Sequence, residues 1–130
     1  MKSAYSWFRN LSFSKTDNAI RHWTATICHI QLTIGIILYS QSPVTRYFLK
    51  NFSTTETQSQ TFFFGLIHSL CMLGAIVVVT IGSAKAKRLH ADNEKFKTMC
   101  YWFGIGLLLI LIAIPWPFSP LAVRPYFRTF

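Results

Sequence analysis

The sequence predicts an all-α integral membrane protein with three transmembrane helices, and two observations carry this prediction. Hydrophobic residues make up 52% of the 130 positions and aromatic residues 16%, more than soluble domains usually hold. They gather into three runs, at 19–40, 61–82 and 99–118, each close to the ~20 residues that cross a hydrocarbon core. A soluble bundle is disfavoured, because one short domain cannot cover three apolar helices with polar residues.

The net charge of +9 comes from basic residues that are unevenly placed. Nine of the 13 lie before or at the start of the first run or within segment 83–97, namely Lys2, Arg9, Lys15, Arg21, Lys85, Lys87, Arg88, Lys95 and Lys97. By the positive-inside rule, we expect the N-terminus and the basic loop 83–97 in the cytoplasm and the C-terminus outside. The charge is therefore interpreted as a topology signal, and no nucleic-acid partner is expected.

The first helix is expected over 19–40, after a basic and aromatic segment that lies along the cytoplasmic surface. Asp17 or Asn18 is the expected N-cap. Ser42 and Pro43 predict a turn after this helix, and the polar stretch 51–60 predicts an external loop. The second helix then covers 61–82.

Segment 83–97 joins the second and third helices and admits two interpretations. Its helix-forming composition allows both helices to continue into a cytoplasmic hairpin, but we favour a solvated loop that only fixes topology. The third helix covers 99–118 and ends at Pro115 and Pro117, before an external tail at 119–130. Cys28, Cys71 and Cys100 lie in or at the edge of the runs, which favours packing roles over disulfides.

Polar residues line two faces of the first helix. His22, Thr26, His29 and Thr33 share one face, and Thr24, Cys28, Gln31 and Gly35 share another that is roughly opposite. Polar residues at bilayer depth usually face protein or water. This helix is therefore expected to have partners on two sides, which two other helices barely supply.

Two histidines, His29 and His68, are expected inside the membrane. Neutral imidazoles at such depth can ligate haem iron, or they can form hydrogen bonds between helices. Helix rise places the two at depths that differ by roughly 6 to 12 Å, which makes a shared haem within one chain doubtful. A soft-metal site with Cys71 and Met72 is a further, less favoured interpretation.

Arg124 and Arg128 are expected in the external tail, on the same side of the membrane as His68. Guanidinium groups there can pair with haem propionates or, as we slightly favour, with lipid phosphates.

A series of short motifs runs through almost the whole chain. It comprises FSKTDN at 13–18, HIQL at 29–32, Gly35, LY at 38–39, SP at 42–43, His68, Met72, TIG at 80–82, KR at 87–88, KFK at 95–97, IPWPF at 114–118 and RPYFR at 124–128. The series resembles small bacterial inner-membrane proteins, about four helices long, that are commonly labelled cytochrome b. The resemblance implies a bacterial inner membrane location and a b-type haem.

Two departures accompany the resemblance. Family members usually begin with a further helix that carries a candidate haem ligand, and this chain starts just after the place where that helix would end. The Glu that usually precedes the second-helix histidine is Ile67 here, which weakens support for His68. The resemblance thus allows a lost cofactor, haem held between subunits, or a helix supplied by a partner protein.

Two functions from different classes follow. The first is cytochrome b-like electron transfer, with His29 and His68 as axial ligands and Arg124 and Arg128 as propionate partners. The second is a cofactor-free accessory subunit that packs its first helix against a larger membrane complex or associates with itself. An enzyme is not expected, because the runs hold no acidic residue and no nucleophile beside a base is visible.

Overall fold

The computed structural model describes residues 2–54 and 60–114, and every regular element within them is helical. Three long helices dominate: α2 (Lys15–Gln41), α5 (His68–Arg88) with the π-helical turn η1 (Phe63–Ile67) before it, and α6 (Asp92–Ala113). All three are long and apolar enough to cross a membrane. The predicted fold class, all-α with three such helices, is confirmed.

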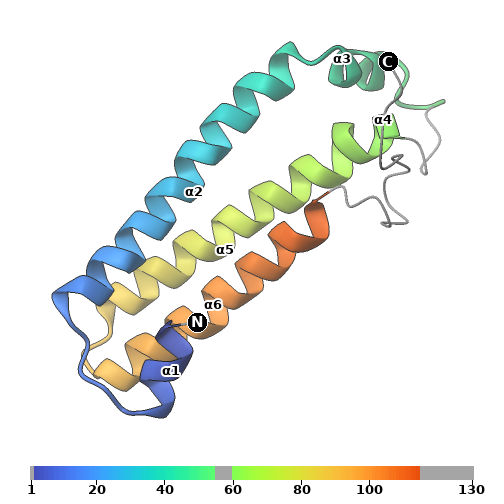
Figure 1. The fold of residues 1–130 in the computed structure, drawn as a ribbon. Helices are drawn as coiled ribbons and strands as arrows, with labels where there is room; N and C mark the ends of the chain where they lie inside the picture. The colour runs from blue at the N-terminus through green and yellow to red at the C-terminus, as the bar shows by residue number, and fades with distance from the viewer. Residues whose placement is uncertain (1, 55–59, 115–130) are drawn as a thin grey trace, which may run out of the picture.

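Helix α5 lies between α2 and α6, and the three long helices run antiparallel in sequence order (Figure 1). Short helices lie at both ends: α1 (Lys2–Phe8) packs on α6, whereas α3 (Pro43–Lys50) and α4 (Gln60–Phe62) adjoin η1. We call the end formed by residues 2–21 and 83–97 the basic end, and the end formed by residues 39–54 and 60–68 the loop end.

Helices α5 and α6 are in close contact because small residues face large ones. A methyl group on Gly82 would lie 2.2 Å from Cβ of Trp102, and one on Gly106 would lie 2.5 Å from Cγ2 of Val79. Small residues of this kind let transmembrane helix backbones approach and gain dispersion contacts. Ala75 and Val79, which are both buried, belong to this contact.

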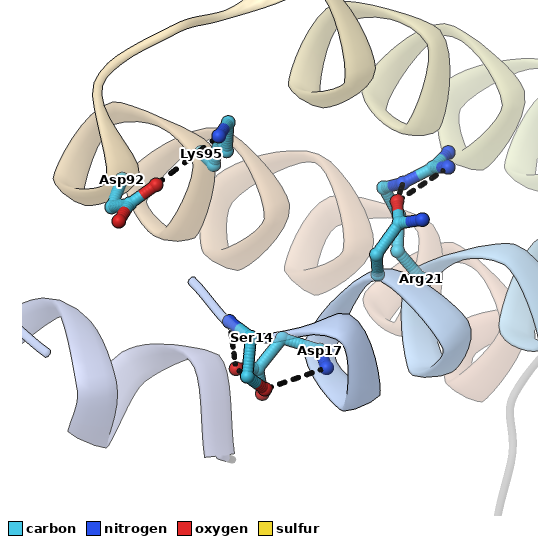
Figure 2. A network of polar contacts seen from close by, with 6 residues as sticks. Ser14, Asp17, Arg21, Asp92 and Lys95 are labelled. Atoms are coloured by element: carbon cyan, nitrogen blue, oxygen red, sulfur yellow. Dashed lines mark hydrogen bonds and ion pairs between the residues drawn. The ribbon is translucent and has the colours of Figure 1, made fainter. Parts of the chain in front are cut away.

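Helix α2 begins at Lys15, and its N-cap is Ser14 rather than Asp17 or Asn18. The Asp17 backbone N–H donates to the Ser14 hydroxyl oxygen at 3.2 Å, and the Ser14 backbone N–H donates to the Asp17 carboxylate at 3.0 Å (Figure 2). This capping box satisfies two backbone donors reciprocally. Our N-cap prediction was wrong because the apolar run starts one turn after the helix does.

Helix α1 lies in the N-terminal segment that we expected along the membrane surface, and it packs on α6. It ends in a Schellman motif, with Asn10 at a positive φ of 49° and Leu11 N–H donating to the Ser6 carbonyl. The Trp7 and Tyr101 rings lie 5.8 Å apart between centroids, and Lys2 forms an ion pair with Asp17 at 2.7 Å. The N-terminal segment therefore joins α6 to the start of α2.

Both helices next to segment 83–97 extend into it, leaving only residues 89–91 between them. The helical hairpin is thus present in place of the expected loop over 83–97, and the role of this segment as a topology signal stays a prediction. Acidic Asp92 and Glu94 lie in the first turn of α6, and Lys85, Lys87 and Arg88 lie in the last turn of α5. Each group has the sign that a helix macrodipole favours at that terminus.

The π-helical turn η1 was not predicted, nor was α3. Gly65 of η1 lies under Phe48 of α3, since a methyl group on Gly65 would come 2.4 Å from Cγ of that ring. The Tyr39 hydroxyl donates to the Gly65 carbonyl at 2.7 Å. Turns of this kind appear mostly as single-turn irregularities within α-helices, and here the turn receives both α3 and the end of α2.

Candidate functional site between the long helices

His29 lies on the face of α2 that meets α5. Its Nδ1 is 2.6 Å from the Ala25 carbonyl oxygen, and its Nε2 is 3.2 Å from Oγ1 of Thr80. Both ring nitrogens are therefore in hydrogen-bond contact with this chain. A histidine in this arrangement serves as a polar contact between helices, the alternative to haem ligation that the sequence left open.

Thr80 completes a short chain of hydrogen bonds. Its hydroxyl lies 2.7 Å from the Ile76 carbonyl oxygen, one turn earlier in α5. Because a carbonyl only accepts, the Nδ1 of His29 must donate to Ala25, so the Nε2 of a neutral ring must accept from Thr80. The single hydroxyl proton of Thr80 is then shared between His29 and Ile76.

His68 lies at the junction of η1 and α5 and has a different environment. Its Nδ1 is 2.8 Å from the Ala113 carbonyl oxygen at the end of α6, and the rings of Phe63 and Phe64 lie about 6.0 and 5.9 Å away. Because Nδ1 must donate to the carbonyl, Nε2 carries the free lone pair. Within the described residues, no hydrogen bond reaches that Nε2.

The structure does not bring the two histidines together. His29 meets Thr80, which follows His68 on the same helix by 12 residues, or roughly 18 Å at the helical rise. The depth difference predicted from the sequence was smaller because it was calculated from assumed membrane boundaries. The structure instead gives a direct contact between the two helices. Two axial ligands of one iron need nearly equal depth, so His29 and His68 of one chain do not form such a pair.

The remaining predicted groups are placed as follows. Arg124 and Arg128 lie outside the described residues. Cys28, Cys71 and Cys100 are partly buried and unpaired with each other. Across residues 2–54 and 60–114, no group of three or more His, Cys, Asp or Glu side chains is placed to hold a metal ion.

In the sequence, Arg21 indicates only topology, and the structure gives it a further role. It is 6% exposed, and Nη1 donates to the carbonyl and hydroxyl oxygens of Ser83 in α5, at 3.1 and 2.5 Å. Nε and Nη2 both donate to Oδ1 of Asn18 (Figure 2). Its position near the start of an apolar run was the available signal, because an arginine there needs polar partners.

Among the described residues, three polar contacts therefore join α2 to α5 and to the turn η1 before it: Arg21 to Ser83 at the basic end, His29 to Thr80, and Tyr39 to Gly65 of η1 at the loop end. The structure defines a small multi-pass architecture, with three candidate membrane helices held together partly by polar contacts. Comparison with family models, curated proteins and solved structures finds no match. The likeness to the cytochrome b-labelled proteins accordingly stays a prediction.

Proposed function

We propose that this protein is a cofactor-free accessory subunit of a bacterial inner-membrane complex. The face of α2 that carries Gln31, which we call the outer face of α2, contacts the partner. Its basic end lies in the cytoplasm, in keeping with the positive-inside rule. The proposal rests chiefly on one residue, Gln31, and on the exposure of the helix that carries it.

Gln31 lies close to the middle of α2 and is exposed. The nearby Thr26 and Thr33 hydroxyls donate to carbonyls within their own helix, whereas the Gln31 amide reaches no described residue. An amide that is left unpaired in hydrocarbon costs several kcal/mol. A helix from another protein, or from a second copy, can supply the missing hydrogen bonds.

The exposure of α2 supports the same conclusion. None of the most apolar stretch of α2 is buried within this chain. In each of the other two long helices, 22% of the corresponding stretch is buried. Helix α2 contacts α5 through His29 and contacts η1 through Tyr39. Gln31 is exposed and therefore lies on a side of α2 that these elements do not cover.

The test is site-specific photo-crosslinking in native membranes, with a photoreactive residue in place of Gln31. We expect one discrete adduct that is heavier than the 15.0 kDa chain. The matched control is Leu107 of α6, which is 56% exposed but belongs to an apolar helix. Absence of an adduct at 31, or equal adducts at both positions, would contradict the proposal, and an adduct of twice the chain mass would indicate self-association.

A second function, b-type haem binding, is favoured by the His68 side chain. Its Nδ1 contacts a backbone carbonyl and its Nε2 is unused by the described residues, which is the tautomer that metal-ligating histidines adopt. The Ala113 carbonyl thus takes the orienting role of the Glu that is replaced by Ile67. The second axial ligand would come from another chain.

A reduced-minus-oxidised absorbance spectrum of protein purified in mild detergent from haem-replete cells tests this second function. With haem, His68→Gln abolishes the b-type band and His29→Gln keeps it, because both His29 nitrogens are already engaged. No band in the unchanged protein would exclude the cytochrome function and leave the accessory role.

A further inference from the structure

A cavity of about 270 Å³ lies at the basic end, where the three long helices meet. Its walls come from Phe13, Ser14, Lys15 and Asn18 around the start of α2, from Ala86, Lys87 and Leu89 at the end of α5, and from Lys95 of α6. Three of these residues are lysines and none is acidic. The volume is slightly below the ~300 Å³ of typical small-molecule pockets, which suits a small ligand group.

Two of the three lysines have no counterion. Lys95 forms an ion pair with Asp92 at 3.1 Å (Figure 2). Its ammonium group also lies 5.2 Å from the centroid of the Phe13 ring. Within the described residues, neither Lys15 nor Lys87 forms an ion pair, a hydrogen bond through its side chain or a ring contact. The nearby carboxylate of Asp17 is already bound by Lys2 and Ser14.

A buried cation lies next to this wall. Arg21 is 6% exposed, and within the described residues no carboxylate lies within ion-pair distance of it. Asn18 connects the two sites, because its Oδ1 accepts from Arg21 and the residue is part of the cavity wall. The Asn18 amide N–H₂ has no described partner and supplies a further donor. Buried cations without a compensating anion are unfavourable, and an anion in the cavity would offset this charge.

We propose that the cavity binds the phosphate group of an anionic phospholipid. The ligand chemistry is a phosphate ester, recognised by the ammonium groups of Lys15 and Lys87 and by the Asn18 amide, with the charge of Arg21 behind it. The helices that form the cavity continue directly into apolar spans, so its occupant lies at the level of lipid headgroups. Basic pockets between transmembrane helices at this level bind anionic headgroups.

The test titrates the full chain, purified in a neutral detergent at constant ionic strength, with short-chain phosphatidylglycerol and follows binding by calorimetry. Short-chain phosphatidylcholine and inorganic phosphate are the two comparison ligands. We expect saturable binding of phosphatidylglycerol, weaker binding of inorganic phosphate, and none of phosphatidylcholine. Lys87→Gln and Lys15→Gln should each raise the Kd about fivefold.

The matched control is Lys97→Gln, which removes the same charge from an exposed position of α6 outside the cavity. Its Kd should change less than about twofold. Equal weakening in Lys97→Gln and Lys87→Gln would overturn the site in favour of diffuse attraction. Phosphatidylcholine binding as tightly as phosphatidylglycerol, or inorganic phosphate doing so, would overturn the lipid assignment. Circular dichroism of each variant verifies folding, which Lys87→Gln should not affect because the Lys87 ammonium forms no hydrogen bond or ion pair with the described residues.

Discussion

The α5–α6 pair and the α2–α5 pair show two ways of joining helices in one small membrane protein. Between α5 and α6, Gly82 and Gly106 bring the backbones close, and the contact is made mostly of apolar atoms. Between α2 and α5 with its preceding turn η1, the contacts that stand out are side-chain hydrogen bonds of Arg21, His29 and Tyr39. The α5–α6 interface is closely packed along the helices. Helix α2, by contrast, is held by a few separate hydrogen bonds, and the rest of its surface is available to other molecules.

The largest effect is expected at the glycines of the close interface. In Gly82→Ala the new methyl group would meet Cβ of Trp102, which side-chain rotation cannot move, so α5 and α6 must separate. We expect a loss of about 3 kcal/mol in the free energy of unfolding, the upper part of the range for overpacking. Unfolding in mixed micelles, followed by circular dichroism, measures it.

Gly104→Ala on α6 and Gly35→Ala on α2 are the controls, because a methyl group at either position meets nothing within 4 Å. Both should leave stability unchanged or raise it by up to about 1 kcal/mol through helix propensity. If Gly82→Ala were as harmless as these, close backbone approach would not explain the α5–α6 interface.

The next largest effect is expected at Arg21. Arg21→Met keeps the aliphatic stem but leaves the Ser83 carbonyl and the Asn18 amide oxygen without their charged donor. The expected loss is about 2 kcal/mol in the same unfolding measurement, as for hydrogen bonds to charged groups. Arg46→Met, at an exposed position of α3, should change stability by less than about 0.5 kcal/mol; equal effects would remove the argument for a fixed contact at Arg21.

A smaller loss is expected at the loop end. Tyr39→Phe deletes the hydroxyl that donates to the Gly65 carbonyl and should cost about 1 kcal/mol, the usual value of one hydrogen bond. The matched change is Tyr47→Phe, since Tyr47 is 60% exposed and no hydrogen bond of its hydroxyl is present in the described structure. A Tyr39 variant as stable as the Tyr47 variant would show that this contact adds nothing.

The smallest effect is expected at Gln31, where the partner lies outside the chain. Gln31→Leu should change the stability of the isolated protein by less than about 0.5 kcal/mol. A loss comparable to that of Tyr39→Phe would place the partner of Gln31 within the chain and so contradict the outer face of α2 as a docking surface.

The sequence predicts the number and class of the long helices well, because runs of apolar residues report directly on length in the bilayer. It predicts their ends poorly. Helix α2 starts at Lys15, α5 reaches Arg88 and α6 starts at Asp92, and in each case polar residues extend the helix beyond the apolar run. A capping box starts α2, and charges of favourable sign lie at the end of α5 and the start of α6, and hydropathy records neither feature.

The candidate site, too, was predicted from the sequence only in part. The polar faces of α2 indicated that His29 and Gln31 need partners, and the structure supplies one for His29 but none among the described residues for Gln31. The depth relation between His29 and His68 was not predictable, since it depends on how far α2 slides along α5. The link from Arg21 to Ser83 joins positions that are 62 residues apart, and no local pattern encodes it.

The π-helical turn at Phe63–Ile67 makes the loop end sensitive to chain length as well as to residue identity. Such a turn corresponds to one residue more than a regular helix needs, so deleting any one residue there would let the helix wind evenly. The helix on either side of the deletion would keep its phase around the axis, because the wide turn is what accommodates the extra residue. Phe48 and Tyr39 both contact Gly65 inside the wide turn, so the deletion would remove the backbone that they contact. Helix α2 would then lose its attachment at the loop end although every side chain in α2 stayed the same.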